Sequence, residues 1–488
     1  MLDCAGPTTG HLGHLFTGGP SMFTRRTVAS IAGLVVLASS LSVATGVSAS
    51  ASPAGTVART QTAIAARVAG QPPRNYVVPS GARFAFPNRS KSERLAIRLS
   101  VLYTVQSTWG GVLDRYKLPL ASNGQIRIAT WSFKDMGIAR ALVAAKNRGV
   151  SVQVVAAQGR NEENKPWRYL KRHLGQRYYK PGVAGSSERI SFARECRGAC
   201  RGRGGTPHAK FFLFDNVGAD HSRNIVMQSS MNLTSFGYMG QWNFAQVVRS
   251  PYVYDRFMRV YREMRLNTPN SAPYRVYPVG DVTSIFFPFP TATASTDPVM
   301  QMLDQVTCTG VPGGSGRTRI RIINYSIYDT RGTWIAKKLR SLWDAGCDIK
   351  VIYSLTTRPV LAILRNGSGR GAIPVKQSVI LNDLGEIVKY NHSKYMTIAG
   401  NYGDNPNAFM TLSGSSNWSN VGLSSDEQMM QISGYGTARA YLLNFDKTWA
   451  QNTSRAPTFA PVAEQRGLPS EQPAFGRGEL KHINAYGD

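Results

Sequence analysis

The pattern of apolar and polar positions along residues 126–157 predicts a strand, a helix and a second strand in that order. Residues 126–135 read IRIATWSFKD, whose β-branched start is typical of a buried strand. Residues 139–149, ARALVAAKNRG, have helical spacing, and residues 151–157, SVQVVAA, are again strand-like. The segment is therefore predicted to form a βαβ unit.

The same pattern recurs about two hundred residues later in the chain. Residues 320–329 read IRIINYSIYD, followed by the helical segment IAKKLRSLWDAG and the strand-like segment DIKVIYS. The aligned identities are Ile126/Ile320, Arg127/Arg321, Ile128/Ile322, Ser132/Ser326 and Asp135/Asp329. Helices are also expected near 253–264 and 437–449, one closing each copy. The chain is thus predicted to be two similar α/β halves with parallel or mixed sheets and right-handed crossovers.

Composition shifts suggest where the halves begin and end. We expect a signal peptide and upstream segment at 1–50, a first half at 51–266, a linker at 267–284, a second half at 285–455 and a tail at 456–488. The linker lies in a stretch rich in Pro, Thr and Ser, and the tail is rich in Pro and Gly.

The N-terminal segment has the order of a secretory signal. Arg25 and Arg26 precede the apolar residues 31–41, and small-residue cleavage sites follow near Ala49 and Ala51. We therefore expect a secreted, extracellular protein, exported by the general or the twin-arginine route. Met22 would be a more natural start than the first residue, and a buried N-terminal helix is the alternative to a signal.

The charge of the chain indicates anionic partners. It has 57 Lys plus Arg against 28 Asp plus Glu, a formal net charge of +29, and 42% hydrophobic residues over 488 positions. The hydrophobic content and length exclude a disordered tail or a peptide hormone. The charge favours nucleic acid, anionic lipid headgroups or phosphorylated small molecules without choosing among them.

Four cysteines remain after the signal segment, an even number that favours disulfides in an exported chain. We predict the pairs Cys196–Cys200 and Cys308–Cys347. A metal site that uses the first pair and His208 is the alternative, although no second pair follows at zinc spacing.

Each half carries one short motif with reactive side chains. His208, Lys210 and Asp215 form the pattern H-x-K-x4-D, and His392 and Lys394 repeat it with Ala399 in place of the aspartate. Because residues i and i+2 of a strand point to the same face, each His and Lys pair is expected to project toward one site. A polar stretch follows each motif, ending in Asn232, 24 residues after His208, and in Asn417, 25 residues after His392.

The two motifs, with their asparagine segments and repeated βαβ units, resemble the phospholipase D superfamily over essentially all of the chain after the signal segment. The resemblance implies two similar α/β/α sandwich halves with mixed sheets, related by a pseudo-twofold, and an active site at their interface. It also implies a reaction without a metal ion or another cofactor. The alternative is two surface histidines beside lysines on solvated strands.

The resemblance also implies a role for each motif residue. His208 would attack phosphorus to give a phosphohistidine, and His392 would protonate the leaving oxygen. The phosphoryl oxygens would be held by Lys210, Lys394, Asn232 and Asn417, and Asp215 would be a supporting residue. Because Ala399 replaces the second aspartate, Glu427 or Asp426 is a candidate for the carboxylate of the second site, and a solvated loop is the alternative.

Two other groups of residues near the motifs have alternative interpretations. The basic, glycine-rich loop 194–205 could line the mouth of the site, or it could be a solvated face. The aromatic residues Trp131, Trp242, Tyr325 and Trp418 could contact substrate or pack in the core.

We therefore expect a metal-independent phosphodiesterase that hydrolyses phospholipid headgroups, with headgroup exchange as a further activity. The expected partners are a phospholipid or another anionic phosphodiester substrate and, transiently, a membrane surface, and the chain is expected to be a monomer. The alternatives are an extracellular nuclease and a non-catalytic binder of anionic surfaces.

Overall fold

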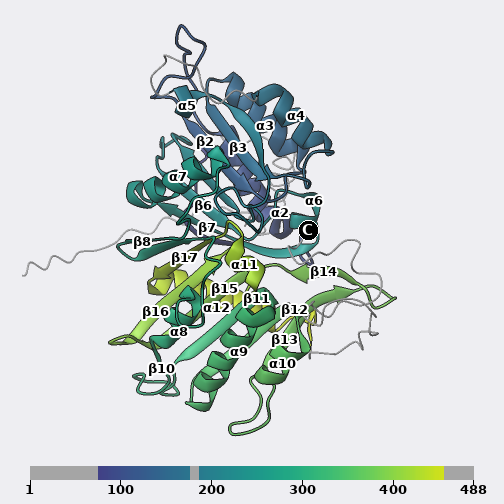
Figure 1. The fold of residues 1–488 in the computed structure, drawn as a ribbon, viewed down its shortest axis with the longest axis vertical. Helices are drawn as coiled ribbons and strands as arrows, with labels where there is room; N and C mark the ends of the chain where they lie inside the picture. The colour runs from purple at the N-terminus through teal and green to yellow at the C-terminus, as the bar shows by residue number, and fades with distance from the viewer. Residues whose placement is uncertain (1–74, 176–185, 456–488) are drawn as a thin grey trace, which may run out of the picture. The chain divides into compact units, whose positions relative to one another are not determined.

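A computed structural model describes residues 75–175 and 186–455 (Figure 1). All of these residues belong to a single unit. The predicted signal peptide and the predicted tail lie outside the described residues. No helix among the described residues is long and apolar enough to cross a membrane.

The first half forms a mixed sheet from strands that are far apart in sequence. Its strand order is β1(Gly81–Ala85), β7(Gln241–Arg249), β6(Ile225–Ser229), β5(Phe211–Asp215), β2(Gln125–Thr130), β3(Ser151–Ala157) and β4(Phe192–Cys196). Strands β2, β3 and β4 are mutually parallel, and the other neighbours are antiparallel. The predicted βαβ unit is β2, α3(Met136–Asn147) and β3.

Helices cover both faces of this sheet. On one face, α2(Lys91–Gln106), α3 and α4(Lys165–Leu174) bury apolar side chains against residues such as Ile128 and Val154. On the other face, α7(Pro251–Leu266) packs Phe257 and Tyr261 against Phe211. The short helices α5(Ser186–Arg189) and α6(Ser235–Met239) lie in the connections.

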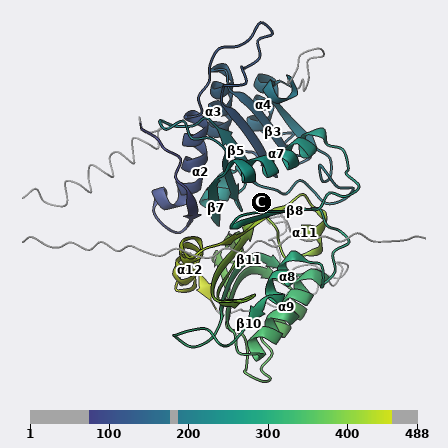
Figure 2. The same ribbon diagram turned by 90° about the vertical axis from the view of Figure 1, so that its left-hand side faces the viewer.

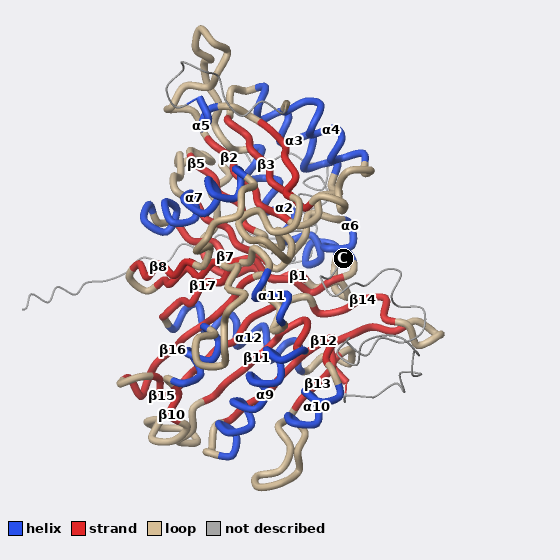
Figure 3. Tube along the Cα trace, in the orientation of Figure 1, coloured by secondary structure: helices blue, strands red, loops and turns tan. Residues whose placement is uncertain are grey.

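The second half repeats this strand order. Its sheet runs β9(Val282–Phe286), β17(Gln428–Ser433), β16(Asn405–Gly414), β15(Lys394–Tyr402), β11(Arg319–Ile327), β12(Asp348–Thr356) and β13(Val375–Leu381). One face is covered by α8(Pro298–Asp304), α9(Asp329–Asp344) and α10(Arg358–Leu364), and the other by α12(Tyr435–Trp449). The remaining elements are β8(Arg275–Val279), β10(Val306–Thr307), β14(Ile387–Asn391), α11(Asn420–Ser424) and β18(Ser454–Arg455). Figures 2 and 3 show the two sheets and their helices from a second direction and by element type. The expected mixed α/β class is confirmed, and the pseudo-twofold stays a prediction.

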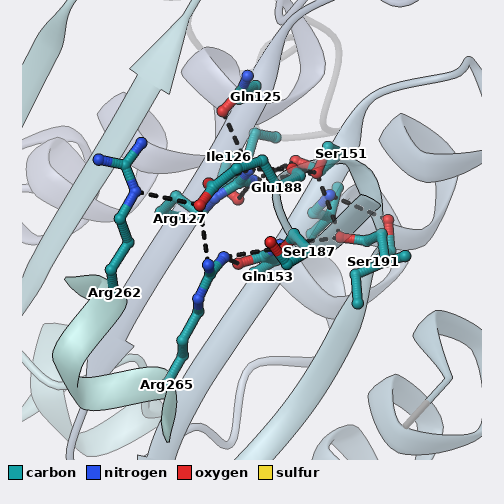
Figure 4. A network of polar contacts seen from close by, with 12 residues as sticks. Gln125, Ile126, Arg127, Ser151, Gln153, Ser187, Glu188, Ser191, Arg262 and Arg265 are labelled. Carbon is teal, nitrogen blue, oxygen red and sulfur yellow. Dashed lines mark hydrogen bonds and ion pairs between the residues drawn. The ribbon is translucent and has the colours of Figure 1, made fainter. Parts of the chain in front are cut away.

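The first strand of each βαβ unit carries a buried arginine at the same position, Arg127 in β2 and Arg321 in β11. Arg127 Nη1 donates to Ile126 O at 3.0 Å and to Ser151 O at 2.9 Å, on the neighbouring strand (Figure 4). Arg321 Nη1 donates to Ile320 O at 3.1 Å and to Asp348 O at 2.8 Å. Both guanidinium groups therefore tie the first strand of their unit to the second.

The segment predicted to be a linker is not an open connection. Residues 275–279 and 282–286 form the hairpin β8–β9, and β9 pairs with β17 of the second sheet. Tyr277 and Val279 pack against the apolar cluster around α7. The start of the second half thus lies within the predicted linker, because these side chains gain burial there.

The C-terminal helix of each half also packs against the other half. The cluster around α7 includes Phe286, Met430 and Ile432 of the second half. The cluster around α12 includes Phe244 of the first half. The edge of one ring faces the other between Phe244 and Tyr441, with the ring centres 5.7 Å apart. Strand β14 adds a parallel pairing to β7. The two halves therefore share their cores.

Both predicted disulfides are present. Cys196 pairs with Cys200 and Cys308 with Cys347, at sequence separations of 4 and 39 residues. The alternative of a metal site at Cys196 and Cys200 is excluded because both sulfurs are consumed in this bond.

Candidate active site

His208 lies in extended backbone just before β5 and is oriented by a carboxylate from the second half. Its Nδ1 is 2.7 Å from Glu427 Oε1, and both side chains are at most 2% exposed. The other carboxylate oxygen of Glu427 accepts a hydrogen bond from Ser415 Oγ. Ser415, Glu427 and His208 thus form a buried relay that crosses from one half to the other.

His392 has a relay of the same form but of different chemistry. Its Nδ1 is 3.2 Å from Asn243 Oδ1, and Ser230 Oγ donates to the same oxygen at 2.8 Å. Asn243 belongs to β7 of the first half, so this relay also crosses between the halves. Its imidazole faces an amide where His208 faces a carboxylate.

The backbone shows that the two relays are equivalent. Ser230 N donates to Phe244 O at 3.2 Å, and Ser415 N donates to Gln428 O at 2.9 Å. Asn243 and Glu427 each directly precede the residue that accepts this bond. They therefore occupy corresponding positions.

The two lysines are held in the same way in both halves. Lys210 Nζ donates to His208 O at 2.6 Å, and Lys394 Nζ donates to His392 O at 2.8 Å. Each ammonium also lies over an aromatic ring, Trp131 at 5.8 Å for Lys210 and Tyr325 at 4.8 Å for Lys394. Each lysine therefore lies over the same aromatic ring that the histidine of its pair contacts.

Asn232 and Asn417 are buried at corresponding turns. Asn232 is followed by Leu233, which bridges to Phe133 after β2, and Asn417 is followed by Trp418, which bridges to Ile327 of β11. Arg331 supports the second turn by donating to Asn417 O at 2.9 Å. Both asparagines therefore stand beside the carboxyl ends of the first strands of the two βαβ units.

Asp215 lies at the opposite end of β5 from His208. Its carboxylate pairs with Arg223 at 2.7 Å and accepts from Asn224 N at 3.2 Å, which fixes a surface turn. Ala399 is within β15, paired with Phe409. The exchange of aspartate for alanine at 399 therefore concerns the far end of its strand, remote from the histidine.

Of the two carboxylates considered for the second site, Glu427 is a site residue but serves His208 of the first half. Asp426 does not face a histidine. It accepts a hydrogen bond from Cys200 N, and burial raises its pKa to about 7. Asp426 therefore joins the disulfide loop to the second half.

Electrostatics set the protonation states of the two histidines. Burial lowers the pKa of His208, Glu427 opposes this shift, and Lys210 adds to it. Burial lowers the pKa of His392 well below its usual range, and the lysines reinforce the effect. The pKa of Lys394 is likewise lowered by burial and then by Lys210. Burial alone would raise the pKa of Glu427, but His208 and Lys210 outweigh it and keep the group a carboxylate.

The residues around the site have mixed roles. In the basic loop, Arg201 is buried and pairs with Glu263 at 2.8 Å, whereas Arg197 and Arg203 are exposed. All four candidate aromatic residues are buried, with exposed fractions of 2% or less. Trp131 and Tyr325 contact the histidines edge-on at 5.5 and 4.8 Å. Trp418 belongs to the core of the second half.

Three residues of the relays were not found from the sequence: Ser230, Asn243 and Ser415. The serines belong to the polar stretches that precede Asn232 and Asn417, so their position could have indicated them. Asn243 follows Asn232 by 11 residues, whereas Glu427 follows Asn417 by 10. Because the spacing differs by one residue and the residue types differ, the sequence alone does not show that Asn243 and Glu427 are equivalent.

A family model described as the phospholipase D-like domain of cardiolipin synthase matches residues 120–265. A search of curated proteins gives no significant match. Among solved structures, phosphatidylserine synthase from Haemophilus influenzae aligns with a TM-score of 0.47 and 11% identity, covering 77% of this chain and 87% of the other. Polyphosphate kinase from Porphyromonas gingivalis aligns with a TM-score of 0.45 and 16% identity, and the alignment covers 67% of this chain and 46% of that enzyme.

The phospholipase D family member Nuc from Salmonella typhimurium aligns with 19% identity and a TM-score of 0.26, over 38% of this chain and 93% of its own. The matched domain covers the first motif, with His208, Lys210 and Asp215. The resemblance to the phospholipase D superfamily is therefore confirmed for residues 120–265.

Proposed function

We propose that the protein hydrolyses phosphodiesters, with phospholipid headgroups as its substrates, through a phosphohistidine intermediate. The observation that carries the proposal is the pair of crossed relays. Each relay holds one buried histidine, and each histidine has a lysine bonded to its own carbonyl. The charges of His208 and Lys210 also act on His392, which supports a single site. One histidine can act as nucleophile and the other as proton donor.

The Glu427 contact suits His208 to the role of nucleophile. A carboxylate next to Nδ1 holds the proton on that nitrogen, so the lone pair lies on Nε2. Since burial lowers the pKa of His208, the ring is neutral near pH 7 and the lone pair is available. The carboxylate then stabilises the positive ring that attack on phosphorus creates.

His392 is suited to proton transfer. Its Nδ1 faces Asn243, and its Nε2 makes no hydrogen bond within the described part of the chain. The lowered pKa makes its protonated form a strong donor. An anionic phosphodiester beside it would favour that protonated form.

The reaction then has two balanced steps. His208 Nε2 bonds to phosphorus as the bond to the leaving oxygen breaks, and this oxygen takes the proton of His392. In the second step neutral His392 takes a proton from water, whose oxygen bonds to phosphorus as the phosphorus–nitrogen bond breaks. An alcohol in place of water would give headgroup exchange.

The lysines and asparagines supply the charge and hydrogen bonds that the phosphoryl oxygens need. Among the described residues, no group of three or more His, Cys, Asp or Glu side chains is arranged to hold a metal ion. We therefore propose that the reaction proceeds in the presence of a chelator.

Several features support a lipid substrate and an extracellular location. The two disulfides favour an oxidising compartment, and the net charge of +29 favours an anionic surface. Both motifs reside in one chain, which supports a monomeric enzyme.

An assay panel tests this function. Phosphatidylcholine and phosphatidylglycerol vesicles and plasmid DNA are incubated with the protein at one salt concentration, with chelator, because electrostatic binding to DNA depends steeply on salt. We expect release of headgroup alcohol, and none from the His208→Asn and His392→Asn variants. DNA cleavage without headgroup release would indicate the nuclease, and binding without turnover would indicate the non-catalytic alternative.

A further inference from the structure

The loop that follows β3 is fixed against the active site by a buried asparagine. Asn161 Nδ2 donates to Trp131 O at 3.1 Å and to Ala157 O at 2.8 Å. Its Oδ1 accepts from Phe133 N at 2.7 Å. Because all three bonds are buried, the loop is held onto the segment that carries Trp131.

The residue before Asn161 is an arginine that reaches this tryptophan. The guanidinium of Arg160 lies over the Trp131 ring, with Cζ 4.9 Å from the ring centre. The same ring contacts the His208 imidazole edge-on at 5.5 Å. Trp131 is therefore shared between an arginine and the proposed nucleophile.

Arg160 differs from its neighbours in exposure and in charge balance. Its side chain is exposed, whereas Trp131 and His208 are each 1% exposed. No carboxylate of the described residues pairs with it, although Glu162 and Glu163 follow closely and are exposed. Arg98, which also lies over an aromatic ring, pairs instead with Asp135 at 2.6 Å. Arg160 thus has no carboxylate partner in the described ranges and is held beside the buried site.

The two halves differ in the cations that lie over the equivalent rings. Among the described residues, no arginine lies over Tyr325, the ring that corresponds to Trp131. Each ring has the lysine of its own half over it, Lys210 over Trp131 and Lys394 over Tyr325. Arg160 is a second cation over the Trp131 ring, on the side of His208.

We propose that Arg160 binds a second anionic group of the substrate, a carboxylate or phosphate carried close to the scissile phosphodiester. This inference rests on the proposed function and deepens it, because it names the substrate class as phosphodiesters with an additional negative charge. A planar guanidinium matches the two oxygens of such a group and loses little freedom when it is already stacked on an aromatic ring.

Two soluble phosphodiesters that differ by one carboxylate test the inference. Glycerophosphoserine and glycerophosphoethanolamine are titrated into the full chain carrying His208→Asn, which removes turnover, and affinity is measured by calorimetry. We expect about tenfold tighter binding of glycerophosphoserine, equal to about 1.4 kcal/mol. Adding Arg160→Ala should abolish this preference, and adding Arg160→Lys should retain part of it.

A matched charge change controls for overall electrostatics. Arg439 is an exposed residue near the start of α12. This helix follows the last residue of β17, whereas Glu427 directly precedes the first residue of that strand. Arg439→Ala should therefore leave the preference for glycerophosphoserine intact. Equal affinities in the Arg160 protein, no binding of either compound, or an unchanged preference in Arg160→Ala would overturn the inference. Tighter binding of an oligonucleotide through Arg160 without the serine preference would also overturn it. Failure of the proposed function is seen separately, as absent headgroup release by the protein with His208 intact.

Discussion

At the residue scale, the most informative difference between the halves is Glu427 against Asn243. Both accept a hydrogen bond from an equivalent serine and face the Nδ1 of a histidine. A carboxylate stabilises an imidazolium strongly, whereas an amide oxygen does so weakly. The two histidines are therefore chemically distinct although their surroundings are built alike.

This difference predicts the effect of Asn243→Asp. A carboxylate beside His392 would raise the pKa of that imidazole from its present low value, because it favours the charged form. The limb of the kcat/KM profile on which His392 loses its proton should therefore move to higher pH. The measurement is kcat/KM against pH for both proteins.

The control is Asn147→Asp, the same exchange at an exposed position of α3. It should leave the profile where it is. If the Asn243→Asp protein unfolds at the wild-type temperature and its profile does not move, His392 is not the group that titrates.

At the element scale, the sequence patterns predicted the repeated units well and the connections less well. The strands and helices of both βαβ units follow from local periodicity. The hairpin β8–β9 was hidden because it contains Pro278, which suggests a linker. Pro278 is tolerated because β8 pairs with β9 alone and lies at the edge of the sheet.

The candidate site was predictable only in part, for a related reason. His208, Lys210, His392 and Lys394 follow from a repeated spacing. The partner of each histidine comes from the other half, and that pairing depends on how the two sheets pack. Glu427 lies close to the second motif in the sequence, which suggests that it serves His392. The packing of the two sheets brings it to His208 of the first half instead.

One buried ion pair that joins helices of the second half should govern its stability in acid. Asp297 precedes α8 and pairs with Arg331 of α9 at 2.9 Å, with neither side chain exposed. Burial alone would raise the pKa of Asp297, but Arg331 outweighs it and lowers it. The stabilisation is thus present above the unfolded pKa of about 3.9 and is lost as pH falls through the lower folded value.

We therefore expect Asp297→Asn to cost about 3 to 5 kcal/mol at neutral pH, because it leaves a buried charge without its partner. The difference in the free energy of unfolding between wild type and Asp297→Asn should become smaller below about pH 4. Urea denaturation across pH measures both. Asp304→Asn removes the exposed pair with Lys338 at 2.6 Å and should cost less than about 1 kcal/mol, and equal costs for the two variants would refute the argument.

The two disulfides should differ in their contribution to the free energy of unfolding. In the chain-entropy model, the Cys308–Cys347 bond closes the longer loop and stabilises by about 3 to 4 kcal/mol, against about 2 kcal/mol for Cys196–Cys200. Denaturation of the two paired Cys→Ser variants checks this. A larger loss from the shorter loop would mean that the Asp426 contact dominates there.

At the scale of the whole molecule, the halves depend on each other in both directions. Each relay crosses the interface, and α7 and α12 each pack against the opposite sheet. When both halves of a site come from the same molecule, a complete site needs His208 and His392 in one chain.

Mixing two inactive proteins tests this dependence. We expect a mixture of His208→Asn and His392→Asn chains to remain inactive, because every molecule lacks one of the two histidines. Activity is measured against wild type diluted to the same concentration with either variant. Recovery of turnover would show that sites assemble from two chains.

If the histidines have the proposed roles, the unequal relays also fix the side of the site from which the leaving alcohol departs. A phosphodiester has two ester oxygens, and a site built from interchangeable histidines would accept it in either of two orientations. In the proposed mechanism, attack belongs to the ring that faces Glu427 and protonation to the ring that faces Asn243. A diester of two different alcohols should therefore lose only the alcohol that lies toward His392, so the orientation in which the diester binds decides which product is released.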